Sequence, residues 1–122
     1  MIRHYFRDRR TVAATLGTTD NVTWGPVLTG RIYHITELAV EDETSAPSTD
    51  VRVVVTGHGF DFPLVEQDLP AAATLYWSET EHVLSEAESL VARFRGATAA
   101  DRLQLYVSGW WEEVGEVAAG NA

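Results

Sequence analysis

The amino-acid sequence predicts an all-β protein, a single β-sandwich or jelly-roll-like domain of about seven or eight antiparallel strands with an extended N-terminal arm. Short segments rich in β-branched and aromatic residues recur at about ten-residue spacing, with turn-forming residues between them. The length of 122 residues suits one domain. We expect a basic arm at residues 1–10, the sandwich at residues 11–114 and a flexible tail at residues 115–122.

The first two strands are predicted in "TVAATL" (residues 11–16) and "VTWGPVL" (residues 22–28), which the turn-forming "GTTDN" separates. We expect these two strands to form a hairpin. In the next segment, "GRIYHITELAVED", the apolar residues alternate except for a step of three between Ile35 and Leu38. Because a strand has a period of two, this slip predicts a β-bulge near Thr36 and Glu37.

The strand with the clearest pattern is predicted in "VRVVVTG", after the polar loop "EDETSAPSTD". Its residues Val51, Val53 and Val55 fall on one face. The following "FDFPLV" contains Pro63, which lacks a backbone donor. This segment is therefore predicted to be an edge strand or an extended loop.

Two later segments also alternate. "AATLYWSE" places Leu75 and Trp77 on one face, and Thr74 and Tyr76 on the other. The last predicted strand, "DRLQLYVSGWWEEV", is interrupted at Gly109 before two tryptophans. Its alternating apolar residues are Leu103, Leu105 and Val107.

The segment "VLSEAESLVARF" (residues 83–94) fits two structures. Its apolar residues recur at three- and four-residue steps, as on one face of a helix, and Ser78 with Glu81 could form a capping box before it. It can equally be divided into two short strands around the turn "SEAE". The regular spacing of the other strands favours the two-strand interpretation, but residues 80–94 stay open between helix and strands.

The charge of the chain is acidic and unevenly distributed. The net charge is -9, with nine arginines and no lysine, which argues against a general nucleic-acid surface. Four of the arginines, Arg3, Arg7, Arg9 and Arg10, lie in the first ten residues. This distribution predicts an arm that contacts an acidic partner, including a second copy of the chain, and the alternative is a solvated, disordered terminus.

No pattern in the sequence predicts catalysis or metal binding. The chain has no cysteine, and only His58 has a nearby second ligand candidate, Asp61. The sequence contains no serine nucleophile motif, no phosphate-binding glycine loop and no apolar run long enough to cross a membrane. The N-terminus does not resemble a secretion signal. Neighbouring carboxylates such as Glu112 and Glu113 are most simply solvated. We expect a non-enzymatic protein without a cofactor or metal, made in the cytoplasm.

The tryptophans are the most informative side chains. There are four, and the adjacent Trp110 and Trp111 must point to opposite faces of a regular strand. One of the two should therefore be exposed or covered by another chain. Tryptophan is favoured at the centres of interfaces, which suggests a subunit contact. A carbohydrate platform and a small satellite core are the alternatives.

From Arg31 onward the chain resembles a family of small accessory virion proteins of tailed bacteriophages. The resemblance rests on "GRIYHITELAVED", "VRVVVTG", "LPAAATLYWSETEHVLSEAESLVARFRG" and "RLQLYVSGW", and it covers roughly residues 30 to 110. It follows hydrophobic spacing rather than an invariant signature. By this resemblance Val83 and Leu84 end one strand, Glu86 and Ala87 stand at a turn, and Ser89 begins the next strand. The chain departs from the family in having no glycine at that turn.

The resemblance implies a β-sandwich or jelly-roll-like virion protein, commonly a trimer, with no catalytic residues. We therefore expect a capsid decoration protein that binds the outer capsid surface as an oligomer, with its own copies and the major capsid protein or another virion protein as partners. A tail, head-fibre or adaptor component and a glycan-binding module that uses exposed tryptophan are the alternatives. Neither nucleic acid nor membrane is an expected partner. The expected interface residues are Arg3, Tyr5, Phe6, Arg7, Arg9, Arg10, Trp24, Trp110 and Trp111.

Overall fold

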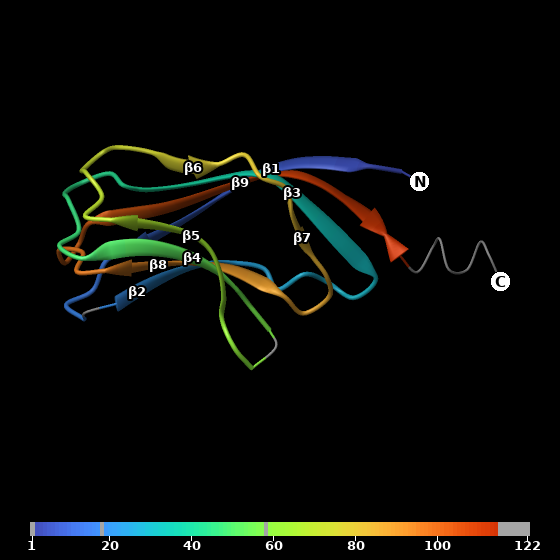
Figure 1. The fold of residues 1–122 in the computed structure, drawn as a ribbon, viewed down its shortest axis with the longest axis horizontal. Coiled ribbons are helices and arrows are strands. Elements are labelled where there is room, and N and C mark those ends of the chain that lie inside the picture. Colours follow the sequence, from blue (N-terminus) through green and yellow to red (C-terminus); the bar gives the residue numbers. More distant parts are fainter. Residues whose placement is uncertain (1, 18, 58, 115–122) are drawn as a thin grey trace.

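The computed structural model describes residues 2–17, 19–57 and 59–114, and it confirms the predicted all-β sandwich (Figure 1). Within these residues nine antiparallel strands form two sheets, one or two strands more than the sequence predicts. The five-stranded sheet contains β1 (His4–Ala13), β9 (Arg102–Glu113) and β3 (Arg31–Asp42), with the short β6 (Tyr76–Ser78) and β7 (His82–Leu84) both paired to β3. The four-stranded sheet has the order β2 (Thr19–Trp24), β8 (Ser89–Arg95), β4 (Asp50–Thr56) and β5 (Phe62–Asp68). The predicted tail, residues 115–122, lies outside the described residues.

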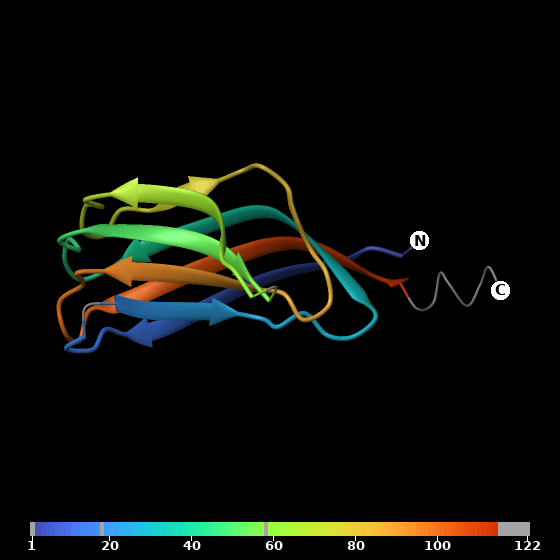
Figure 2. The same ribbon diagram turned by 60° about the horizontal axis from the view of Figure 1, so that its bottom comes forward.

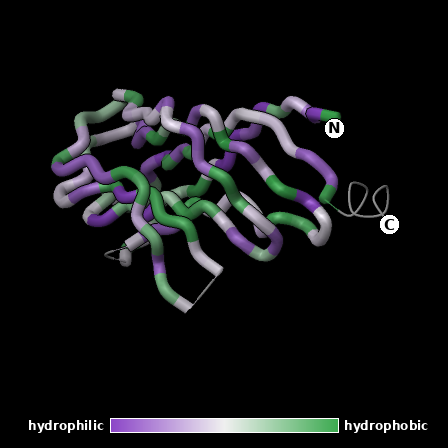
Figure 3. Tube along the Cα trace, turned by 45° about the vertical axis from the view of Figure 1, so that its right-hand side comes forward, coloured by the Kyte–Doolittle hydropathy of each residue, from purple (hydrophilic) through white to green (hydrophobic). Residues whose placement is uncertain are grey.

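The two sheets lie face to face and enclose one apolar core (Figure 2). Inward-facing side chains from both sheets are fully buried there, and they include Val22, Ile35, Leu38, Val53, Leu90, Phe94, Leu103 and Leu105. Hydrophobic and hydrophilic stretches interleave along the chain (Figure 3), as expected when each strand turns one side to the core.

The N-terminal region differs from the prediction. Residues 4–10, expected in a separate arm, belong to β1, which pairs with β9 from His4 opposite Trp111 to Ala13 opposite Arg102. The segment alternates as a strand does despite its many charged residues, because Phe6 and Val12 pack against the core while Arg7 and Arg9 point outward. The expected first hairpin is also wrong, because β1 and β2 belong to different sheets.

The predicted bulge is confirmed. In the pairing of β3 with β9, the register shifts between Ile35 and Glu37. Gly109 lies opposite, and a Cβ atom at this position would be 1.9 Å from the carbonyl oxygen of His34. The glycine therefore admits the bulged backbone of β3, and β9 continues through it to Glu113 rather than ending there.

The contested residues 80–94 form two strands, β7 and β8, and the helix interpretation is wrong. The turn between them has Ala87 in the left-handed region, at φ 69°, where the family pattern has glycine. Glu88 fixes this turn, because its Oε1 accepts hydrogen bonds from the backbone N–H (2.6 Å) and hydroxyl (2.7 Å) of Ser85. Apart from Ala87 in the turn, the apolar residues spaced like a helix face are strand residues on either side of it.

The prediction for Pro63 is confirmed. This residue lies in β5, an edge strand that pairs with β4 and, among the strands of residues 2–17, 19–57 and 59–114, with no other. The register of that pairing shifts between Val53 and Val54. An irregular edge of this kind accommodates a residue that cannot donate a backbone hydrogen bond.

Candidate functional site

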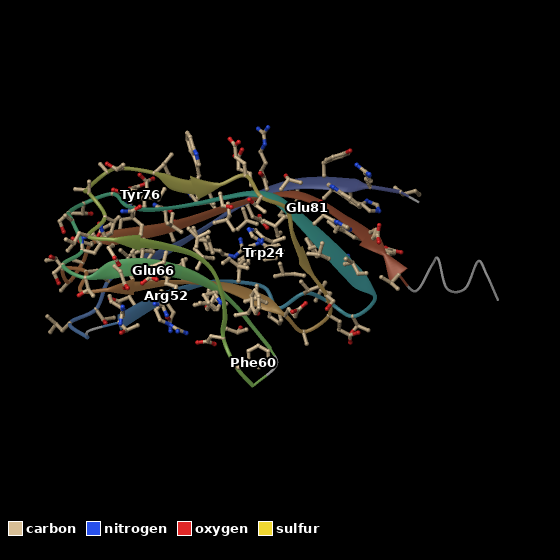
Figure 4. The ribbon with its side chains drawn as sticks, viewed as in Figure 1. Trp24, Arg52, Phe60, Glu66, Tyr76 and Glu81 are labelled. Carbon is tan, nitrogen blue, oxygen red and sulfur yellow. The ribbon has the colours of Figure 1, made fainter. Side chains whose placement is uncertain are left out.

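Two of the predicted interface aromatics, Phe6 and Trp24, lie between the sheets. Trp24 is 4% exposed, and its Nε1 donates a hydrogen bond of 2.9 Å to Asp8 Oδ2. Figure 4 shows Trp24 between the two layers. Its ring stacks on Phe6 at 5.6 Å and meets the edge of Tyr33 at 5.0 Å. Trp24 is thus occupied within its own chain, and leaves almost no surface for a partner.

Trp110 and Trp111 point to opposite faces, as predicted. Trp111 lies on the core side, near Tyr33 (ring centroids 6.0 Å apart) and His4 (4.0 Å). Trp110 lies on the outer face of the five-stranded sheet, where its ring stacks on His34 at 3.7 Å and the Arg3 guanidinium covers it at 4.1 Å. It is 9% exposed. The tryptophan expected to be free or covered by another chain is therefore covered by residues of its own.

The outer face of the five-stranded sheet carries a groove of about 550 Å³. Small side chains of two neighbouring strands, Ala39 and Ser108, form its floor. Larger side chains stand around it: Arg7, Glu37, Leu75, Trp77 and Tyr106. A second hollow of about 490 Å³ shares Arg7 and Ser108 with it and extends toward Tyr5 and Trp110. The two hollows adjoin at Arg7 and Ser108 on the face formed by β1, β9 and β3, and together we call them the outer groove.

Apolar side chains at the outer groove are unusually open to solvent. Tyr5 is 73% exposed, Trp77 is 65% exposed and Leu75 is 46% exposed. Sequence reasoning identified Tyr5 but did not include Leu75 or Trp77 among the interface residues. The signal was present, because Leu75 and Trp77 alternate with Tyr76, and Tyr76 is the residue that packs against the core. Exposed apolar surface of this kind marks an interaction site more often than an isolated side chain does.

The outer groove separates charges of opposite sign. On one side lie Arg7 and Arg9 of β1 and, just before that strand, Arg3, which are three of the residues predicted to meet an acidic partner. On the other side, β3 presents Glu37 and Glu41, and Glu43 follows directly after the strand. The Tyr106 hydroxyl donates a 2.6 Å hydrogen bond to Glu41 Oε1. Burial and this carboxylate raise the pKa of Tyr106 to about 12.

Arg10 lies apart from these three arginines. It forms an ion pair with Asp8 at 3.7 Å and borders a small hollow near Trp24 on the core side of β1.

A second apolar surface lies at the loop between β4 and β5. Phe60 is 63% exposed and Phe62 is 59% exposed, and with Val83 they border a hollow of about 320 Å³. In the view of Figure 4, Phe60 stands at the bottom, while β1 and β6 of the five-stranded sheet run along the top. We call Phe60, Phe62 and Val83 the loop patch. His58, considered from the sequence as a metal ligand, lies outside the described residues.

Two groups of carboxylates are close together. Asp50, Glu66 and Asp68 can bring one oxygen each within 4.8 Å of one another, and Arg95 pairs with Asp50 and lowers its pKa. Asp42 and Asp101, both 2% exposed, meet where the loop after β3 contacts the start of β9. Burial, followed by the neighbouring Asp101, raises the pKa of Asp42 to about 6. The pKa of Asp101 is lowered, because hydrogen bonds with Asp42 and Ser45 outweigh its burial.

Known proteins offer little guidance. No family model matches the chain, and no curated protein matches it. A structure of infectious bursal disease virus, Gt strain, is 10% identical over 89% of this chain and 30% of the other, with a TM-score of 0.34. A structure of the Gx strain is 13% identical over 98% of this chain and 42% of the other, with a TM-score of 0.22. The chain thus spans less than half of either, and likeness at this level does not extend to function. No helix in the described residues is long and apolar enough to cross a membrane.

Proposed function

We propose that this protein is a non-enzymatic structural protein of a tailed-phage virion, a capsid decoration protein that binds the outer capsid surface as an oligomer and stabilises it. The observation that carries the proposal is the presence of two separate exposed apolar surfaces, the outer groove and the loop patch, on one small sandwich. A subunit that contacts both its own copies and a different protein needs two such surfaces. The resemblance of residues 30 to 110 to virion proteins supplies the context.

The loop patch is the surface we assign to the capsid. The test is co-sedimentation of the protein with purified capsid shells. Replacing Phe60 and Phe62 together by Ser should abolish binding, because the patch loses both of its exposed aromatic rings. Leu16→Ser is the matched control, because Leu16 is 95% exposed in a different loop. Equal binding by the double variant and the control would contradict the assignment.

A glycan-binding module is the second candidate function. It is favoured by the exposed rings of Tyr5 and Trp77 beside the polar side chains of Arg7, Glu37 and Ser108 in the outer groove. A sugar ring stacks on an exposed aromatic face while polar groups bind its hydroxyls. Oligosaccharide binding that is lost in Trp77→Ala, by a protein that does not bind shells, would select this function over decoration.

A further inference from the structure

Two opposite charges face each other across the outer groove without meeting. Arg7 of β1 and Glu37 of β3 are both in register with Ser108 of β9, which lies between them. Two strand spacings, about 10 Å, therefore separate their backbones. Within the described residues, neither side chain forms a hydrogen bond or an ion pair. Each is a charged group that lacks a partner of its own at the edge of an apolar hollow.

We propose that the outer groove is a self-complementary surface at which two copies of the chain pair face to face about a two-fold axis parallel to β9. Rotation about such an axis keeps positions along the strands and exchanges the two sides of the sheet. Because Arg7 and Glu37 share one row on either side of β9, Arg7 of each copy then stands over Glu37 of the other. A two-fold axis across the strands would instead place arginine over arginine.

The shapes of the two sides suit the same arrangement. Arg7 and Arg9 follow one another along the outer face of β1, and the hollow over Ala39, beside Trp77, is where these side chains of the second copy would enter. The exposed Trp77 ring would in turn lie beside the arginines of the second copy, where an arginine can stack on it. Sheets that pack in this aligned way lie about 10 Å apart, because the side chains of the two faces interdigitate.

The open edge of β1 is a poorer surface for self-association. Pairing of two β1 strands would bring Arg7, Arg9 and Arg10 of both copies together, and charged edge strands disfavour such pairing. The face-to-face arrangement deepens the proposed decoration function, because it names the surface through which copies associate. It gives a dimer, whereas the family resemblance implies a trimer.

Charge reversal on the full chain tests the pairing by sedimentation equilibrium. Arg7→Glu and Glu37→Arg, each alone, should weaken association at least about tenfold, because like charges then face each other. An equimolar mixture of the two variants should recover dimers, since every Glu then faces an Arg. In a closed ring the two variants must alternate so that every Glu faces an Arg. A ring of three cannot alternate two variants, so recovery by mixing distinguishes a dimer from a trimer. Arg52→Glu and Glu86→Arg carry the same charge changes elsewhere on the surface and should remain dimeric, and circular dichroism confirms the fold of all four.

A wild type that sediments as a monomer or a trimer would overturn the pairing, as would a mixture that fails to recover dimers. The decoration proposal fails separately. A monomeric wild type that still binds capsid shells would overturn the pairing and leave capsid binding through the loop patch supported. Dimers with the predicted charge behaviour that bind no shells would support the pairing and overturn decoration.

Discussion

Replacing Asp42 by Asn should stabilise the protein at neutral pH. Asp42 Oδ1 accepts hydrogen bonds from the backbone N–H groups of Thr44 (3.0 Å) and Ser45 (3.2 Å). The buried Oδ2 has no donor to accept from, so it can form a hydrogen bond with Asp101 only when Asp42 is protonated. Asn keeps the accepting oxygen and places an amide donor where the second oxygen faces Asp101. It therefore reproduces the protonated form of Asp42 at every pH.

The magnitude follows from the pKa of Asp42, which is raised from 3.8 to about 6. A difference of one in pKa corresponds to about 1.4 kcal/mol, so the ionised carboxylate costs the folded state up to about 3 kcal/mol at pH 7. Because the folded state binds this proton more tightly, the stabilisation is complete below pH 3.8 and is lost as the pH rises through about 6. The pKa of Asp101 is lowered, so its ionised carboxylate stabilises the folded state, and that stabilisation is lost as the pH falls and Asp101 is protonated.

Urea unfolding of the wild type and Asp42→Asn between about pH 3.5 and 7.5 measures this dependence. We expect the free energy of unfolding of the variant to exceed that of wild type by about 1–3 kcal/mol at pH 7 and to equal it near pH 4. The decrease in stability that wild type shows as Asp42 ionises should therefore be absent from the variant. Asp68→Asn, at an exposed carboxylate, is the control and should leave the dependence in place. A variant that is no more stable than wild type at pH 7, or that keeps the same pH dependence, would refute the reasoning.

Three further substitutions test the fold. Gly109→Ala should destabilise by more than about 3 kcal/mol in thermal or urea unfolding, because its Cβ would overlap the His34 carbonyl at 1.9 Å; an unchanged midpoint would contradict the close approach. Ala87→Gly should stabilise by up to about 1 kcal/mol, because its φ of 69° is a conformation that glycine adopts without strain. Ala13→Gly, in the extended β1, should instead destabilise, and equal effects in the two alanines would count against the assigned turn. Trp24→Phe should cost at least about 1.5 kcal/mol through loss of the Nε1 hydrogen bond to Asp8, and a double-mutant cycle with Asp8→Ala should recover that coupling.

Alternation of apolar residues along the chain was enough to predict the sandwich, the bulge at Thr36 and the edge strand at Pro63. These features depend on local side-chain period and on one missing donor, which the sequence displays directly. The path of the N-terminus could not be predicted in this way. Within residues 4–13 only Phe6 and Val12 pack against the core, among charged neighbours, and pairing with the distant β9 decides that the segment forms a strand.

The candidate site was predicted in part. Arg3, Tyr5, Arg7 and Arg9 lie on the outer face, but Trp24 and Phe6 are taken up by the core. The sequence of a strand indicates that one of its tryptophans must be covered. It does not indicate which other element covers it. Glu37 and Trp77 become neighbours of Arg7 only through strand pairings between residues far apart in the sequence, so no local pattern could single them out.

Because of the bulge in β3, the residues at positions 36 and 109 should change together during evolution. The extra residue near Thr36 and the glycine at position 109 lie in different parts of the gene, yet neither is tolerable without a match in the other strand. Deleting Thr36 would keep Ile35 and Leu38 facing inward and would free position 109 to carry a side chain. Relatives should therefore retain the extra residue and the glycine together or lose them together, and an alignment would show this as covariation across some seventy positions.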